Sequence, residues 1–159
     1  MARVARRVFL SFAALLLLAA PAGAQGCDPT TGTRELKSRF NFDTLLERVE
    51  KAVADQGMGL VAQASASRGA AGRGVEIPGN AVVMVFRNDF AVRMLEASIA
   101  AGIEAPLRLY VVGNADGTAT LSYRAPSAVF GPYHVKKLDA LARELDPIFE
   151  KIAAQAGGQ

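Results

Sequence analysis

Cysteine and histidine are nearly missing from this chain of 159 residues, in which Cys27 is the only cysteine and His134 the only histidine. A single cysteine excludes an internal disulfide, because a disulfide joins two thiols. A zinc site needs three or four protein ligands, usually cysteine and histidine, so these two residues cannot supply one. We therefore expect a domain that depends on its hydrophobic core and holds no metal.

Motifs of common catalytic sites are also missing. The sequence has no Gly-x-Ser-x-Gly nucleophile elbow and no Cys-x-x-Cys-His haem attachment signal. Its acidic residues are spread along the faces of the expected helices, so no carboxylate pair is suited to acid–base work. His134 follows Tyr133 and has no nucleophile to activate, and we interpret it as an exposed or capping side chain. The sequence indicates no catalytic residue and no cofactor.

The chain does, in contrast, contain a long apolar segment near its first residue. Three arginines stand among the first seven residues, an uncharged and largely apolar run follows over residues 8–20, and small residues at 22–24 follow Pro21. This order is typical of a secretory signal peptide. The run is thirteen residues long, whereas a membrane-spanning helix needs about 20, so an uncleaved anchor is the less favoured alternative. We predict a signal peptide over residues 1–24 and a periplasmic or secreted protein.

The residues after this leader leave two ways of processing open. Ala24-Gln25-Gly26-Cys27 resembles a loose bacterial lipobox, with a small residue before the cysteine but Ala24 where a large aliphatic residue is usual. Either the leader is cleaved after Ala24, or a lipid on Cys27 makes a lipoprotein anchored without a transmembrane helix. Residues 25–32 are small, polar and turn-rich, which predicts a flexible tether.

The net positive charge of the chain comes from its leader. Residues 1–24 hold three of the 18 basic residues and no acid, so 18 − 3 = 15 basic residues face 15 acidic residues in the mature chain. A nearly neutral domain has no global basic surface for nucleic acid. We expect an unknown small molecule or protein as partner, with a homodimer as one possibility and membrane contact only through a lipid on Cys27.

Periodicity in the first half of the mature chain predicts two strands, a helix and a long loop. Polar and apolar residues alternate over 35–40, which indicates a strand with one wet face. Asn41 or Asp43 can cap the amphipathic helix that follows, and Gly57 ends it. Residues 60–67 form a weaker strand, and residues 68–79, with four glycines, are expected to be a long flexible loop.

The short β-branched run 81–86 predicts the central strand of a sheet. Asn88 or Asp89 is expected to cap the next helix, which ends at Gly102. The apolar stripe expected to face the core consists of Val92, Leu95 and Ile99, flanked by Phe90 and Met94.

The second half of the chain contains a predicted hairpin and a long helix. Residues 107–112 and 118–123 are expected to pair across a turn at 113–117. A loop over 124–133 follows, and then one helix that continues through Pro147 with a kink. The element order is β-α-β-β-α-β-β-α, which predicts one two-layer α+β domain over residues 33–155. We expect a largely antiparallel five-stranded sheet with helices on one face.

Several of these landmarks together resemble the domain-of-unknown-function 302 family. They are the helix that ends at Gly57, the strand ending in Phe86-Arg87-Asn88-Asp89, Ala105-Pro106-Leu107-Arg108, Asp116-Gly117, and Ser122-Tyr123 followed by Pro126. The resemblance spans residues 33–155. It implies an α+β fold similar to the TATA-binding-protein-like class and no established activity.

The sequence also departs from that family in two places. Family members usually read Phe-Gly-Asn-Pro where this chain has residues 86–89, so only Phe86 and Asn88 match. Many members have a histidine at the end of the second strand, where this chain reads Ala-Ser-Ala-Ser at 64–67. A function that rests on that histidine is not expected here.

Four residues are candidates for binding a ligand: Arg87, Asn88, Tyr110 and Tyr123. Asn88 lies at a helix start and matches the family, and the tyrosines could provide an aromatic wall. An anion pocket built from Arg87 with the loop arginines 68 and 73 is the weaker alternative, since Asp89 can fill the helix start itself. We expect a non-enzymatic binding or interaction module of the cell envelope; the alternative is an envelope enzyme with an unrecognised active site.

Overall fold

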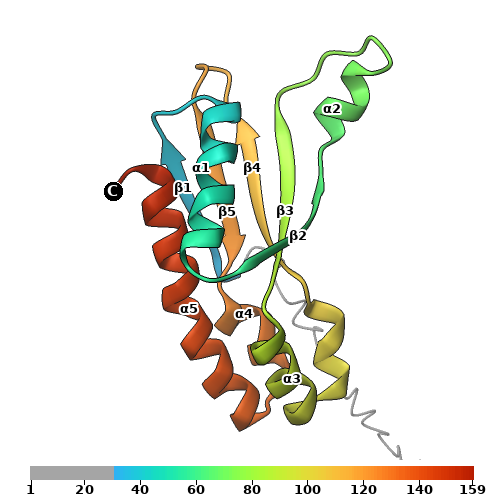
Figure 1. Ribbon diagram of the computed structural model, residues 1–159, viewed down its shortest axis with the longest axis vertical. Coiled ribbons are helices and arrows are strands. Elements are labelled where there is room, and N and C mark those ends of the chain that lie inside the picture. Colours follow the sequence, from blue (N-terminus) through green and yellow to red (C-terminus); the bar gives the residue numbers. More distant parts are fainter. Residues whose placement is uncertain (1–30) are drawn as a thin grey trace, which may run out of the picture.

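The computed structural model describes residues 31–159, which form a five-stranded antiparallel sheet with helices on one face (Figure 1). The strand order is β1-β5-β4-β3-β2, and all four neighbouring pairs are antiparallel. The strands are β1 (Thr33–Ser38), β2 (Gly59–Ala64), β3 (Asn80–Phe86), β4 (Leu107–Gly113) and β5 (Ala119–Arg124). The predicted α+β class, the antiparallel sheet and the order of the main elements are confirmed. The predicted leader, the tether before Thr31 and Cys27 lie outside the described residues.

Two helices, α1 (Phe42–Asp55) and α5 (Lys136–Gly157), pack against each other and cover one face of the sheet. Alternation along the strands explains this, because every second residue of β3 and β4 is buried. The fully buried side chains Val83, Leu109 and Leu121 on the sheet meet Val49 and Phe149 on the two helices in one core. None of the helices in residues 31–159 covers the opposite face of the sheet, and residues such as Arg108 and Tyr110 on it are exposed.

The ends of α1 follow the sequence prediction. The Asn41 side chain accepts a hydrogen bond from the Thr44 backbone N–H at 2.9 Å, which caps the first turn. Gly57 has φ +68°, a left-handed conformation that glycine adopts without strain, and it directs the chain into β2. The predicted hairpin of β4 and β5 and the single long helix through Pro147 are also present.

The segment expected to be a flexible loop contains a short helix, α2 (Ala66–Ala71). Ser65 caps it by accepting a hydrogen bond from the Arg68 backbone N–H at 3.2 Å. The Asn80 side chain accepts another from the Ala66 backbone N–H at 3.0 Å, which attaches the start of α2 to the start of β3. The loop prediction is therefore wrong for residues 68–71, and the strand predicted over 60–67 ends at Ala64. Serine and asparagine provide caps that glycine content alone does not reveal. The arm that carries α2 extends beyond the end of the sheet (Figure 1).

The helix after β3 differs from its prediction in its cap, its end and its buried face. Helix α3 (Asn88–Ala97) begins after Arg87, and no side chain caps it. It ends at Ala97, before a 3₁₀ helix, η1 (Ile99–Glu104), that contains Gly102. The core receives Phe90 and Met94, whereas the predicted stripe lies on the surface.

The predicted loop between β5 and the last helix also contains helical turns, α4 (Pro126–Phe130) and η2 (Gly131–Tyr133). Together with α3, η1 and the first half of α5, they form the end of the molecule opposite to the arm of α2 (Figure 1). Among the helices that the structure describes, none combines the length and the apolarity needed to span a bilayer.

Candidate functional site

A groove opens where β4 and β5 separate at the end of the sheet nearest α4. The two strands pair from Gly113–Ala119 to Leu109–Tyr123, and the ladder stops there. β4 starts two residues earlier, after Pro106, while β5 continues to Arg124 and then turns into α4. The divergence leaves a groove of about 250 Å³ between the strand ends.

The floor of this groove is apolar. Leu107, Tyr123 and Val129 line it, and each exposes only 8% of its surface. The Tyr123 ring packs against Phe149, with 5.7 Å between the ring centroids. Burial raises the pKa of Tyr123 above its ordinary value, and the nearby Glu150 carboxylate adds to this rise. Tyr123 therefore keeps its proton at neutral pH and contributes an aromatic surface rather than a base.

The rim of the groove is polar and positively charged. Arg108, Tyr110, Ser122, Arg124 and Thr33 line it from the open face of the sheet. Extending the β4–β5 register by one position past Leu109–Tyr123 places Arg108 across from Arg124. The ladder has ended at this point, so the two arginines are not a cross-strand pair, but both contribute positive charge to the rim.

Neither arginine has a carboxylate partner. Within residues 31–159, no acidic side chain lies within ion-pair distance of the Arg108 or the Arg124 guanidinium. Arg124 donates one hydrogen bond, from Nη2 to the Ala128 carbonyl at 3.2 Å, which holds its side chain against α4. Glu35 pairs with Ser122 in the β1–β5 ladder and is the acidic residue next to the groove. The arrangement leaves two permanent positive charges free to bind an anion.

The groove unites two of the four residues that the sequence suggested. Tyr110 and Tyr123 point to opposite faces of the sheet, because they occupy positions of opposite parity in the β4–β5 register. Both nevertheless line the groove, Tyr110 from the rim and Tyr123 from the floor, since the strands no longer pair at this point.

Arg87 and Asn88 lie elsewhere. Arg87 donates hydrogen bonds from Nε and Nη2 to the Asp89 carboxylate at 2.8 and 3.2 Å, and its guanidinium stacks 4.1 Å from the centroid of the Phe90 ring. These bonds hold the pKa of Asp89 below its ordinary value. Arg87 borders a separate apolar cleft of about 30 Å³, which holds little more than a water molecule. Asn88 is the first residue of α3 and lines neither cavity.

The two arginines of the rim are not among the ligand-binding candidates that the sequence indicates. Arg108 was noted only as part of a family landmark, and Arg124 as the start of a loop. The predicted hairpin contained the necessary signal, since pairing residues 109 and 123 puts 108 opposite 124. The divergence of the strands, which makes the groove, has no such signal in the sequence.

Other residues considered from the sequence are separate from the groove. His134 is exposed and adopts a left-handed conformation, φ 54°, at the end of η2. Arg68 lies in α2, and Arg73 is exposed two residues after that helix, so they do not form a pocket with Arg87. Within residues 31–159, no three His, Cys, Asp or Glu side chains are grouped as metal ligands would be.

Comparison with known proteins gives a family and a fold. The model of the family described as "Domain of unknown function DUF302" matches residues 34–155. Among solved structures, the chain is similar to an uncharacterized conserved DUF302 protein from Bacillus stearothermophilus. The two share 17% sequence identity with a TM-score of 0.71, over 79% of this chain and 98% of the other. No curated protein matches the chain significantly.

Proposed function

The chain belongs to the family described as "Domain of unknown function DUF302", and from its groove we propose that it is a binding module for a small organic anion. The family name implies no reaction, so the proposal rests on the residues of the groove. We further propose that the module is exported to the cell envelope and is not an enzyme.

One observation carries this proposal: Arg108 and Arg124 line the same groove, and neither has a carboxylate partner among residues 31–159. A guanidinium stays protonated at every physiological pH and presents a planar set of donors that fits a carboxylate or a phosphate. An anion between the two would relieve their mutual repulsion. The Tyr110 and Ser122 hydroxyls stand next to the pair and can donate further hydrogen bonds.

The floor of the groove defines the rest of the ligand. Leu107, Tyr123 and Val129 offer apolar and aromatic surface but no charge. A ligand with a flat apolar body and an anionic group would therefore contact both floor and rim, as pockets commonly combine an apolar lining with a few placed polar groups. A bare inorganic anion would use only the rim.

The titration of these groups favours binding over acid–base catalysis. Burial raises the pKa of Tyr123, so its hydroxyl stays protonated at neutral pH and does not act as a base. Each charged hydrogen bond contributes about 1.5–3 kcal/mol, which is enough to hold a small ligand without a chemical step.

Calorimetric titration of phenyl phosphate, benzoate and inorganic phosphate tests the proposal. We expect phenyl phosphate and benzoate to bind, and inorganic phosphate to bind at least tenfold more weakly because it cannot use the floor. Arg108→Gln should weaken phenyl phosphate binding by about 1.5–3 kcal/mol, the value of a charged hydrogen bond.

Arg73→Gln is the matched control, because it removes an exposed arginine far from the groove. Its affinity should equal that of the unsubstituted protein. Equal weakening by both substitutions would mean that net charge attracts the probe, and equal affinity of Arg108→Gln and the unsubstituted protein would refute the groove as the site.

Export is tested separately from binding. The pattern of residues 1–24 predicts that the mature protein starts at Gln25 or is blocked at a lipidated Cys27. N-terminal sequencing and mass spectrometry of the protein from the producing cell distinguish the two. A folded protein that mostly retains Met1 would contradict export.

A further inference from the structure

Four apolar side chains protrude at the end of the molecule formed by α3 and η1. Val92 and Leu95 on α3 are 47% and 46% exposed, and Ile99 and Ile103 on η1 are 84% and 83% exposed. We call these four residues the apolar tip. Two isoleucines with more than four fifths of their surface in water are unusual for a domain that buries Phe90 and Met94 from the same helix.

The apolar tip is continuous. The Leu95 side chain lies directly over Gly102, where an added Cβ would stand 3.0 Å from Leu95 Cδ2. Gly102 lies on the same 3₁₀ helix as Ile99 and Ile103, so Leu95 packs against the helix that carries both isoleucines. Residues 97–103 contain no charged side chain. The tip is a convex surface and not a groove, so it does not offer a pocket for a small molecule.

The chain enters the described domain at this same end. The Gly32 carbonyl accepts a hydrogen bond from the Ala125 backbone N–H at 2.9 Å, and Gly32 packs against Ala128 of α4. α4 in turn contacts η1. Cys27 precedes Thr31 by four residues, which reach at most about 14 Å when fully extended. A lipid on Cys27 would therefore hold this end of the molecule, which carries the apolar tip, close to the membrane.

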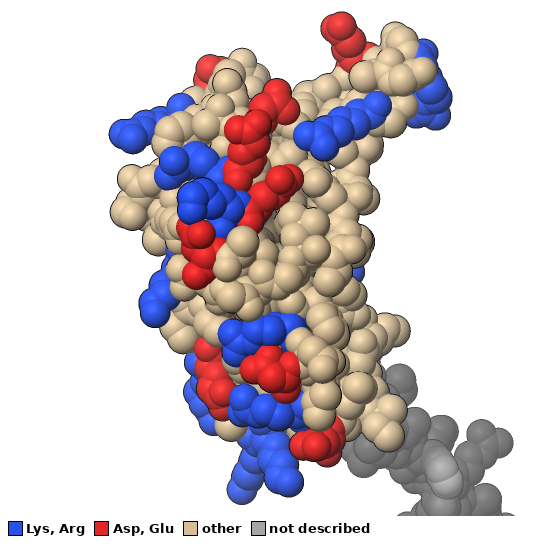
Figure 2. Space-filling view, viewed as in Figure 1, with Lys and Arg blue, Asp and Glu red and all other residues tan. Residues whose placement is uncertain are grey.

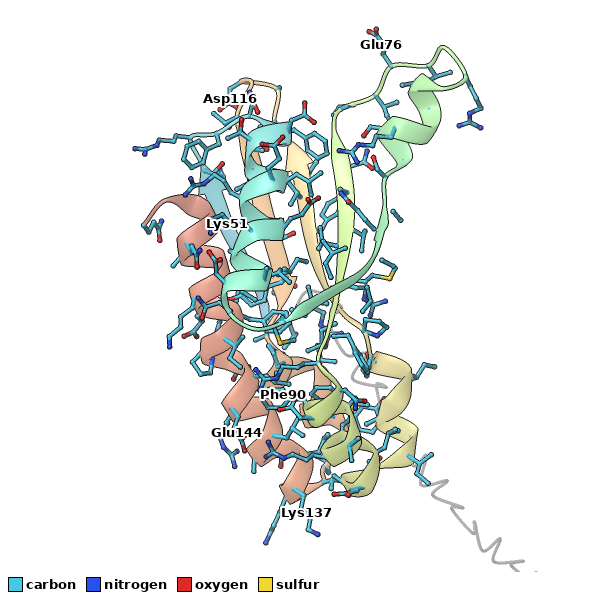
Figure 3. The ribbon with its side chains drawn as sticks, viewed as in Figure 1. Lys51, Glu76, Phe90, Asp116, Lys137 and Glu144 are labelled. Carbon is cyan, nitrogen blue, oxygen red and sulfur yellow. The ribbon has the colours of Figure 1, made fainter. Side chains whose placement is uncertain are left out.

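Positive charge is present at this end as well. Lys136 and Lys137 begin α5 and are exposed. Figure 3 shows Lys137 at the end of the long axis opposite to Glu76, which lies on the arm of α2. Figure 2 shows lysine and arginine side chains at that lower extremity, with acidic side chains interspersed just above them. Lysines at the same end of a molecule as protruding apolar residues are suited to a surface with anionic headgroups over hydrocarbon.

We propose that the apolar tip inserts into the lipid surface of the envelope and orients the domain on it. The proposal rests on the export proposed above. It does not use the anion groove, so ligand binding in the groove and membrane insertion of the tip can each fail without the other. A bilayer accepts protruding isoleucines without a complementary pocket, and the nearby chain entry keeps the tip at the surface. A second copy of the chain is the competing occupant.

The chain offers a clean reporter for this proposal, since it has no tryptophan and only one cysteine. The buried core runs from Leu45 to Ala156, so the protein without residues 1–24 keeps its whole core. Coupling this protein through Cys27 to maleimide lipid, in vesicles of phosphatidylethanolamine and phosphatidylglycerol, reproduces the anchor chemically. Ile103→Trp then places one tryptophan on the tip.

Ile77→Trp is the matched control, because Ile77 is a 43% exposed isoleucine on the segment between α2 and β3, at the far end of the molecule. With brominated acyl chains in the vesicles, we expect the emission of Ile103→Trp to be quenched at least twofold more than that of Ile77→Trp. Adding Leu95→Ser and Ile99→Ser to Ile103→Trp should abolish the difference, while circular dichroism remains unchanged.

Two outcomes would overturn the proposal. One is equal quenching of the two tryptophans. The other is a blue shift of Ile103→Trp without quenching, accompanied by a doubled mass of the uncoupled protein in light scattering, which would assign the tip to contact between two copies.

Discussion

Arg48 shows how much of the fold can depend on one side chain. It lies on α1 but donates hydrogen bonds from Nε to the Ala156 carbonyl at 2.6 Å and from Nη2 to the Gln155 carbonyl at 2.8 Å. Carbonyls in the last turn of a helix lack partners within the helix, and a cation there also interacts favourably with the helix dipole. The guanidinium stacks on the Phe40 ring at 4.4 Å, so Arg48 connects α1 with the turn that follows β1 and with the end of α5.

Substituting Arg48 should therefore destabilise the protein more than substituting an ordinary surface arginine. We expect Arg48→Met to lower the free energy of unfolding by about 1.5–3 kcal/mol, the value of hydrogen bonds to a charged group. Urea denaturation measures the change. Arg143→Met is the control, since Arg143 is exposed on α5, and its effect should stay within about 0.5 kcal/mol. Equal stability of both variants would show that the Arg48 contacts contribute nothing.

At the scale of single residues, the sequence predicted those roles that depend on close neighbours in the chain. Asn41 caps α1 because its acceptor group lies three residues from its donor, and Gly57 ends α1 by its own conformation. Arg48 and Arg124 could not be predicted in this way, since their partners are set by the packing of helices or the divergence of strands. Asn88 was predicted as a cap from its residue type, but α3 starts one residue earlier, after Arg87.

Helix α3 shows where the sequence was insufficient at the scale of an element. Its predicted inward stripe of Val92, Leu95 and Ile99 is exposed, while the flanking Phe90 and Met94 enter the core. A helix with apolar residues on more than one face does not identify its buried face by periodicity alone. The buried face of α3 is determined here by its packing against α5. That contact joins segments distant in sequence, so the local pattern does not predict it.

The contact between α3 and α5 includes an ion pair that makes stability depend on pH. Arg93 donates from Nη1 and Nη2 to the Glu144 carboxylate at 2.8 and 2.6 Å, and this bond lowers the pKa of Glu144 below its ordinary value, about 4.3. A lowered pKa in the folded state stabilises the protein above the unfolded pKa, and this contribution is lost as the pH falls through the folded pKa.

We therefore expect Glu144→Gln to reduce the loss of melting temperature between pH 5 and pH 3. At pH 7 the variant should be only slightly less stable, because the pair is exposed to solvent. Calorimetric scans at pH 3, 4, 5 and 7 measure this. Arg93→Gln removes the partner of Glu144 and should reduce the loss in the same way. Identical profiles for Glu144→Gln and the unsubstituted protein would contradict the link.

The β-ladder around Val111 offers a second test among the elements. Val111 is fully buried and pairs with Ala81 on β3 and Leu121 on β5. Val111→Pro removes a ladder donor and leaves a buried carbonyl without its partner, so we expect a loss of at least about 2 kcal/mol. Val61→Pro, at the irregular position of the edge strand β2, should cost less, because proline is tolerated at bulges on edge strands. Thermal denaturation of the two variants compares them; an equal loss would argue against the central position of β4.

For the molecule as a whole, the predicted architecture is confirmed, and the reason lies in local patterns that agree with one another. Residues 81–86 read as a central strand and are one, and the turn at 113–117 places β4 beside β5. The open groove and the apolar tip were not predicted, since each is made by segments distant in sequence, such as β4 with α4 or Gly32 with Ala128. Sequence patterns determine elements, whereas surfaces depend on how the elements meet.

Gly79 lies at one such contact between segments distant in sequence. It lies before β3, and its carbonyl accepts a hydrogen bond from the Gly113 backbone N–H at 2.7 Å. An added Cβ would stand 2.5 Å from Phe42 Cγ at the start of α1. We expect Gly79→Ala to cost about 1–3 kcal/mol through overpacking.

Gly69→Ala is its control, because Gly69 lies in α2 with nothing near an added Cβ. It should be neutral or stabilising by up to about 1 kcal/mol. Chemical denaturation of both variants gives the comparison, and equal stabilities would show that α1 does not press on Gly79.

The pairing of β1 with β5 also fixes the order in which the sheet can be completed. All other neighbouring strands follow one another in the sequence, but Ser38 bonds to the Ala119 carbonyl across a separation of 81 residues. Pairing over that separation closes a long loop, whereas a hairpin such as β4 with β5 closes a short one and forms sooner. The first strand synthesised is therefore the last to find its neighbour. The charged side chains of β1, Arg34, Glu35 and Lys37, disfavour its pairing with other chains before β5 is in place.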